Sequence, residues 1–150
     1  MENYTILHLH TDLSTATTNI DSVTKSEDYI KRASELGMKA IAFTEHGNIL
    51  NWAKKKETCE KYGLKYIHGI EAYLTETLDE KVRDNYHCCL YAKNYDGVKE
   101  LNKLISKSFN RKDNHFYYTP RITLDELEQT SNNIIVTSAC LGGIFGKANK

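Results

Sequence analysis

The sequence predicts an α/β protein in which short strands alternate with helices around a parallel sheet. Along the 150 residues, short aliphatic and aromatic runs alternate with segments whose apolar side chains recur at helical spacing. The connections are mostly short, as in successive βα units that share one sheet. An apolar fraction of 40% and a charged fraction of 27% are typical of a globular domain with a real core.

The expected strands are short runs of apolar residues bounded by polar ones. The first begins Tyr-Thr-Ile-Leu, the second contains Ala-Ile-Ala-Phe, and the third contains Tyr-Ile-His-Gly-Ile. The fourth contains Cys-Cys-Leu-Tyr-Ala and the fifth Ile-Ile-Val-Thr-Ser. In chain order they are expected at Tyr4–His8, Lys39–Thr44, Lys65–Tyr73, Tyr86–Ala92 and Asn133–Ser138.

Helices are expected between these strands. Ser26 is a suitable N-cap for the first helix, and Gly37 is a suitable stop. Gly63 ends the second helix in the same way. Segments 75–85 and 110–121 fit neither pattern and are expected to be irregular. In chain order the helices are expected at Ser26–Leu36, Asn48–Tyr62, Tyr95–Ser108 and Leu124–Gln129.

The overall charge and the cysteines exclude several classes of protein. Twenty basic and 20 acidic residues give no net charge, so any nucleic-acid contact must come from a local patch. No apolar stretch approaches the ~20 residues of a membrane span, and no secretory signal is seen, so no membrane partner is expected. The four cysteines form no C-x-x-C pair, which favours reduced thiols in the cytoplasm.

Possible metal ligands cluster near the ends of the expected strands. His8 and His10 are two positions apart, so in an extended strand they project from the same face. In parallel α/β folds the ligand site lies beyond the carboxyl ends of the strands, where most of these residues fall. His87 opens its strand and fits this pattern least simply. The further candidates are Glu45, His46, Glu71, His87 and Cys140.

Each of these residues also has a simpler interpretation. A lone histidine near a strand end is more often hydrogen-bonded at the surface than metal-bound, a lone glutamate is most often solvated, and a lone cysteine is most often a small buried residue. His68 and His115 keep the simpler interpretation, because no partner pattern supports them. The run Lys54-Lys55-Lys56 is interpreted as the exposed face of the second helix.

The motifs around these residues resemble the PHP (polymerase and histidinol phosphatase) family. The similar stretches are His-Leu-His-Thr-x-x-Ser from His8, Thr-Glu-His-Gly-Asn from Thr44 and Gly-Ile-Glu-Ala-Tyr from Gly69. Three more resemble the N-terminal PHP domain of bacterial DNA polymerase III alpha subunits: 92–97, 116–121 and 137–143. The resemblance implies that residues 1–150 are the N-terminal part of a distorted (β/α)7 TIM-like barrel, about five βα units, truncated before the C-terminal end of the domain.

The resemblance also implies a set of metal ligands. Asp21 matches the family's third ligand better than Thr17, which implies a short insertion within residues 15–20. Glu71 would bridge two ions, while Glu45, where the family usually has Asp, would orient a ligand or a water; with His10 these form the expected catalytic group. The family's final Asp-x-His pair has no match before Lys150. The implied ligands are His8, His10, Asp21, His46, Glu71, His87 and Cys140.

Such a ligand set suits Zn²⁺, Mn²⁺ or Fe²⁺, with Mg²⁺ possible. The resemblance implies two or three such ions and phosphoesterase or 3′–5′ exonuclease chemistry. The implied partners are DNA and the remaining polymerase domains or other replisome subunits. Two alternatives stay open: a non-catalytic, metal-stabilised module of the polymerase, and a stand-alone phosphatase of the histidinol-phosphate type. The polymerase-like stretches around Pro120 and Cys140 count against the second. No polymerase carboxylates can be assigned, so this chain is not expected to polymerise DNA alone.

A segment that mixes basic and aromatic residues is a candidate nucleic-acid contact, with Arg111, Tyr117 and Arg121 as the residues expected to bind. Stacking and phosphate contacts could hold a single strand there. A solvated loop whose aromatic rings pack on the domain is an equal alternative. The whole segment comprises Lys107, Arg111, Lys112, His115, Phe116, Tyr117, Tyr118 and Arg121.

Overall fold

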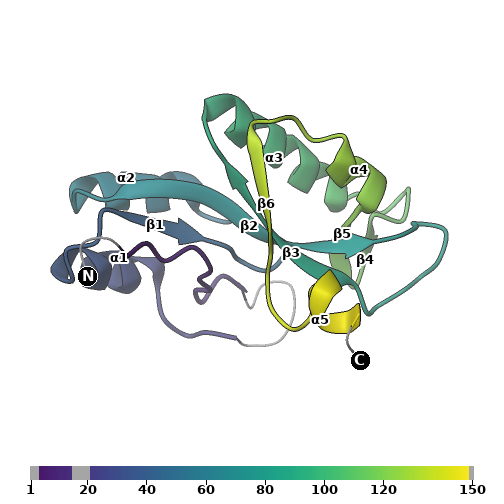
Figure 1. The fold of residues 1–150 in the computed structure, drawn as a ribbon, viewed down its shortest axis with the longest axis horizontal. Coiled ribbons are helices and arrows are strands. Elements are labelled where there is room, and N and C mark those ends of the chain that lie inside the picture. The colour runs from purple at the N-terminus through teal and green to yellow at the C-terminus, as the bar shows by residue number, and fades with distance from the viewer. Residues whose placement is uncertain (1–3, 15–20, 149–150) are drawn as a thin grey trace.

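A mixed sheet of six strands organises the part of the chain that the computed structural model describes, residues 4–14 and 21–148 (Figure 1). The strands are β1 (Ala40–Phe43), β2 (Lys65–Thr75), β3 (Tyr86–Ala92), β4 (Phe116–Tyr117), β5 (Thr119–Thr123) and β6 (Ile134–Ser138). The helices are α1 (Ser26–Glu35), α2 (Trp52–Lys61), α3 (Tyr95–Ser108), α4 (Leu124–Glu128) and α5 (Ile144–Ala148).

The long strand β2 has three neighbours. Its first part pairs in parallel with β1, its last residues pair in parallel with β5, and its middle pairs antiparallel with β3. Glu71 is opposite Cys89 of β3 and also forms a parallel bridge with His46. Because one residue cannot have two partners on the same edge, β1 and β5 lie along one edge of β2 and β3 lies along the other.

The prediction of a parallel sheet is wrong for two pairs of the expected strands. β3 runs antiparallel to β2, and β6 runs antiparallel to β3. A parallel neighbour needs a crossover of a dozen or more residues, usually a helix. The β2–β3 connection, residues 76–85, contains no helix. The start of β3 therefore lies at the same end of the sheet as the carboxyl ends of β2 and β6, which places His87 beside the other candidate ligands.

The first expected strand forms only one β-bridge, between Ile6 and Ile41. The segment nevertheless continues alongside β1. Ala42 N–H donates to the carbonyl of Ile6 at 2.9 Å, and Thr44 N–H donates to that of Leu9 at 3.0 Å. His8 and His10 therefore sit on an extended segment that is bonded to β1.

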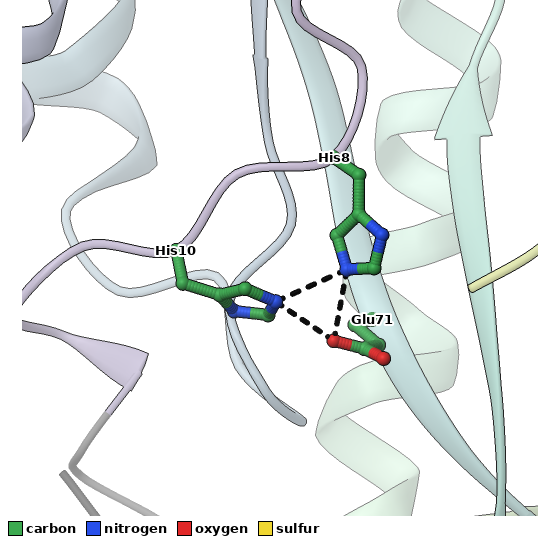
Figure 2. A group of neighbouring side chains, drawn as sticks. All are labelled: His8, His10 and Glu71. Carbon is green, nitrogen blue, oxygen red and sulfur yellow. Dashed lines mark hydrogen bonds and ion pairs between the residues drawn. The ribbon is translucent and has the colours of Figure 1, made fainter. Parts of the chain in front are cut away.

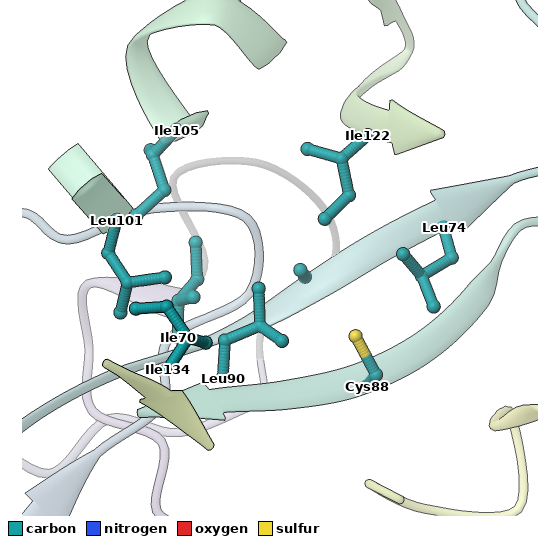
Figure 3. Packing of buried hydrophobic residues seen from close by; sticks show 9 residues of the cluster. Ile70, Leu74, Cys88, Leu90, Leu101, Ile105, Ile122 and Ile134 are labelled. Carbon is teal, nitrogen blue, oxygen red and sulfur yellow. The ribbon is translucent and has the colours of Figure 1, made fainter. Parts of the chain in front are cut away.

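Two clusters of buried side chains hold the helices on the sheet. Leu101 and Ile105 of α3 pack with Ile70, Leu90 and their neighbours on β2, β3 and β5 (Figure 3). A second cluster joins α1 and α2 to β1 through residues that include Ile30, Cys59 and Phe43. The helices thus cover the sides of the sheet and leave the strand ends to the candidate ligands.

Most expected elements are present with shifted ends, and three short ones were missed. α2 begins at Trp52 rather than Asn48, because the Asn48 side chain accepts from Leu50 N–H and holds the chain in a turn. β4 and β5 fall in a segment expected to be irregular, where Pro120 weakened the strand pattern. α5 was not expected.

Among the described residues, no helix is long and apolar enough to cross a membrane.

The packing predicts the effect of truncating Leu90, which is fully buried on β3. Leu90→Ala should lower the free energy of unfolding by about 2–5 kcal/mol, since it leaves a cavity in the core. Val136 pairs with Leu90 on β6 but is 46% exposed, so Val136→Ala should cost less than about 1 kcal/mol. Urea unfolding of both variants checks this, and equal costs would contradict the assigned core.

Candidate metal centre

The centre of the site is the carboxylate of Glu71, which is 1% exposed and is contacted by four imidazoles. Oε2 lies 3.1 Å from Nε2 of His8, 2.9 Å from Nε2 of His10 and 3.2 Å from Nδ1 of His46. Oε1 lies 3.0 Å from Nδ1 of His87. Figure 2 shows His8 and His10 converging on the Glu71 carboxylate.

Different segments bring these side chains together. His8 and His10 come from the extended segment beside β1, and His87 comes from the start of β3, opposite Tyr73. His46 is held in the turn after β1, where Gly47 N–H donates to the carbonyl of Glu71 at 2.8 Å. Gly47 has φ +63°, and a Cβ there would lie 2.6 Å from Cγ of Pro120. The turn therefore requires glycine both for its backbone angle and for the close approach of β5.

Two other expected ligands lie at the edge of this cluster. Oδ2 of Asp21 is 3.0 Å from Nε2 of His46, and Sγ of Cys140 is 3.5 Å from Nδ1 of His87. Residues 15–20, which include Thr17 and the expected insertion, lie outside the described residues. The cluster opens into a hollow of about 400 Å³ lined by His8, His10, His46, Glu71 and Cys140.

The donor atoms fit divalent metal ions. Nε2 of His8 and Nε2 of His10 are only 3.0 Å apart and both face the Glu71 carboxylate. Two nitrogen lone pairs this close repel each other unless a proton or a cation lies between them. The described residues contain two groups with mutually close ligand atoms, His8–His10–Glu71 and His46–Glu71–His87, which share Glu71. Imidazole and carboxylate donors suit Zn²⁺, Mn²⁺ and Fe²⁺.

The electrostatics keep Glu71 ionised. Burial alone would raise the pKa of this carboxyl, but hydrogen bonds from His10, His8 and His87 hold it far below its ordinary value. The pKa of His8 is raised to about 10, first by a hydrogen bond to Cys89 and then by one to Glu71. Burial lowers the pKa of His46 and favours the neutral imidazole, which is the metal-binding form.

Glu45, an expected catalytic residue, does not join this cluster. Its carboxylate is 1% exposed and accepts hydrogen bonds from Thr11, Ser14 and Lys55. Burial raises its pKa, but the charge of Lys55 and these hydrogen bonds outweigh burial and bring the pKa below the ordinary value. The Glu45 carboxylate therefore lies outside the cluster, and its oxygens are bonded to groups of the protein.

Lys55 is the residue that sequence reasoning missed. The expectation that it lies on an exposed helix face is wrong, because its side chain is 2% exposed and its Nζ lies 2.6 Å from Oε1 of Glu45. One signal was available. Trp52, Lys55 and Cys59 recur at helical spacing, so Lys55 shares a face with the buried Cys59.

The expected nucleic-acid residues have different surroundings. Arg121 is fully buried, and its guanidinium donates to backbone carbonyls of Glu80, Val82 and Asn114, among others. It supports the loops and is not placed to contact a phosphate. Arg111 is exposed, with its guanidinium 4.0 Å from the centre of the Phe116 ring, and Tyr117 is half-buried.

His68 and His115 have the structural roles expected of them. His68 is hydrogen-bonded to the Tyr66 hydroxyl at 3.1 Å and to Oδ1 of Asn102 at 2.9 Å. His115 lies between Asp113, at 2.7 Å, and Glu126, at 2.9 Å. Both imidazoles are buried and bonded within the protein, so neither is a candidate metal ligand.

Fold and site together define an α/β protein with a histidine–carboxylate cluster of metal-ligand type at the ends of its strands. The chain belongs to the PHP domain family, whose model matches residues 7–150. It is 41% identical over 145 residues to the DNA polymerase III subunit alpha of Borreliella burgdorferi, covering 93% of this chain and 12% of that protein. It is 38% identical over 143 residues to that of Helicobacter pylori, covering 93% of this chain and 11% of that protein.

The chain thus spans about an eighth of the length of these relatives. Among solved structures, it is similar to an amidohydrolase from Chromobacterium violaceum with bound sulfate and no metal, at 17% identity and a TM-score of 0.47. That similarity covers 69% of this chain and 34% of the amidohydrolase.

Because Glu71 belongs to both groups of candidate ligands, Glu71→Gln should greatly weaken metal binding. An amide is a weaker ligand than a carboxylate and does not balance the charge of several imidazoles. The dissociation constant for Mn²⁺, measured by titration calorimetry, should rise by more than the ~10–100-fold that loss of an outer hydrogen-bond partner costs. Glu128→Gln, which changes an exposed carboxylate on α4, is the control and should bind as the unmodified chain does. Equal binding by both variants would contradict the assignment.

Proposed function

We propose that this chain is the PHP domain of a DNA polymerase III alpha-type protein and that its centre is a metal-dependent phosphoesterase site acting on DNA 3′ ends. One observation carries the proposal: a buried carboxylate shared by four imidazoles opens into a solvent-accessible hollow. The family match and the polymerase relatives support the proposal that the chain is part of a replicative polymerase. We propose that this polymerase works in the cytoplasm with other replisome subunits. We also propose that the complete domain is a distorted (β/α)7 barrel, as the family resemblance implies.

The residues that would hold the metal ions are His8, His10, Asp21, His46, Glu71, His87 and Cys140, with Glu71 between the two groups. Two or three divalent ions bound there would supply Lewis-acid chemistry at a phosphoryl group. The chain's own contribution is to hold the imidazoles and an ionised carboxylate in fixed positions, with Tyr73 packed against His46 and His87.

A nucleic-acid strand would reach the centre past the β4–β5 hairpin. This hairpin packs against the turn that carries His46, through the contact between Gly47 and Pro120. Arg111 and Tyr117 remain the proposed DNA contacts, since an arginine beside an aromatic ring can bind a phosphate and stack on a base. Arg121 is left out of the proposal because its side chain is fully buried and its guanidinium donates to backbone carbonyls of the protein.

The alternative is a metal-binding module that stabilises the polymerase without hydrolysing anything. The crowding of Nε2 of His8 and Nε2 of His10 fits metal binding under either proposal. The exposed hollow favours the enzyme, because a purely structural site is usually closed.

The test is Mn²⁺-dependent release of nucleotides from 5′-labelled single-stranded DNA, with p-nitrophenyl phosphate as a second substrate. We expect nucleotide release that stops when EDTA removes the metal and that falls more than about 100-fold in His10→Ala, which loses a ligand. Lys56→Ala, on the exposed side of α2, should keep full activity.

Three results would contradict the nuclease proposal. Tight metal binding with no hydrolysis of either substrate would indicate the structural module. Hydrolysis of p-nitrophenyl phosphate alone would indicate a small-molecule phosphatase. Activity that survives His10→Ala would place the chemistry elsewhere.

A further inference from the structure

Lys55 is unusual among the lysines of α2 because it lies inside the protein. Its neighbours Lys54 and Lys56 are exposed and pair with Glu57 and Glu60 on the same helix. The side chain of Lys55 instead is 2% exposed, passes the ring of Phe43 and ends 2.6 Å from Oε1 of Glu45. Burying an ammonium group is costly, so an unpaired lysine would not be kept in this position.

Lys55 is one of four donors that saturate the Glu45 carboxylate. Thr11 donates twice, through its N–H at 2.9 Å and its hydroxyl at 2.6 Å. The hydroxyl of Ser14 donates at 2.6 Å. An ionised carboxylate can only accept hydrogen bonds, so the single proton of the Ser14 hydroxyl must point at Glu45.

This orientation of Ser14 determines which nitrogen of His10 carries a proton. Nδ1 of His10 lies 2.9 Å from Oγ of Ser14. Because the Ser14 proton is already given to Glu45, Oγ can only accept here, and Nδ1 of His10 must be the donor. Nε2 of His10 then lies 2.9 Å from Oε2 of Glu71, where a metal ion that replaces the proton between them would meet its lone pair (Figure 2). The backbone N–H of His46 also donates to Oγ of Ser14, at 3.2 Å.

We propose that Lys55 is a positioning residue of the metal centre, which acts through Glu45 and Ser14 to hold His10 in its metal-binding tautomer. Lys55 compensates the buried charge of Glu45, and ionised Glu45 fixes both the Thr11–Ser14 segment and the direction of the Ser14 hydroxyl. Without Lys55, the Glu45 carboxylate loses a buried partner and is no longer held in this position. Ser14 is then free to donate to Nδ1 of His10, which puts the imidazole proton on Nε2, where the metal should bind. This inference rests on the proposed metal centre.

The test compares Lys55→Met with Lys54→Met and Lys56→Met, which change the exposed lysines on either side. Two quantities are measured: the protonation of Nδ1 of His10 in the metal-free protein, by ¹⁵N NMR of the imidazoles, and the dissociation constant for Mn²⁺, by calorimetry. In the unmodified chain and both controls, Nδ1 of His10 should be protonated in every molecule. Lys55→Met should show a mixture of tautomers and a dissociation constant about 10–100-fold higher. Lys55→Arg, which keeps a cation, should recover most of the affinity.

Ser14→Ala is a second variant that tests the proposal even if Lys55→Met does not fold. It leaves the Lys55–Glu45 ion pair intact and removes only the hydroxyl that links Glu45 to His10. It should produce the same tautomer mixture and the same loss of affinity. Wild-type tautomer and affinity in folded Lys55→Met, or in Ser14→Ala, would overturn the proposal. An unmodified chain with fixed His10 protonation but no metal binding would instead refute the proposed function and leave the Lys55–Glu45–Ser14 arrangement standing.

Discussion

The buried carboxylate of Glu71 is the group on which the arrangement of the site depends. A carboxylate out of contact with water must be paired, or it becomes neutral. Here four imidazoles from three separate segments contact it, and hydrogen bonds from His10, His8 and His87 hold its pKa far below the ordinary value. The same contacts bring imidazole and carboxylate ligand atoms together in two groups that could hold divalent cations.

Strand β2 makes this convergence possible because its middle and its end are paired on both edges. On one edge it bonds the turn that carries His46, and on the other it bonds the antiparallel strand that begins at His87. The N-terminal segment, bonded to β1, adds His8 and His10. Beneath these ligands, the buried pair of Glu45 and Lys55 connects the second helix to the loop after His10. The centre is therefore supported from the sheet, from a helix and from Thr11 and Ser14, which donate to Glu45.

The sequence predicted which candidate ligands lie together better than it predicted the strands that carry them. His8 and His10 converge as an extended backbone requires, although their segment forms one bridge rather than a full strand. His87 fitted the predicted parallel sheet poorly, because strand direction depends on the connection and not on the composition of the strand. Once β3 is antiparallel, the position of His87 follows from its register.

The errors concern charged residues with long apolar stems. Arg121 and Lys55 were assigned to a nucleic-acid surface and to an exposed helix face, since charged side chains are rarely fully buried without partners. Both are buried because the fold supplies those partners, backbone carbonyls for Arg121 and Glu45 for Lys55. Their partners are remote in sequence: Glu45 is ten residues from Lys55, and Glu80 is 41 residues from Arg121. No local pattern reports such a pairing.

Anomalous diffraction from crystals grown with Zn²⁺ would test the central claim most directly, because it locates bound metal independently of any activity. We expect at least one peak at the zinc edge, about 2.0–2.2 Å from Nε2 of His8, Nε2 of His10 and a Glu71 oxygen. Crystals with peaks only elsewhere, and with the imidazoles still bonded directly to Glu71, would contradict the interpretation of this cluster as a metal centre.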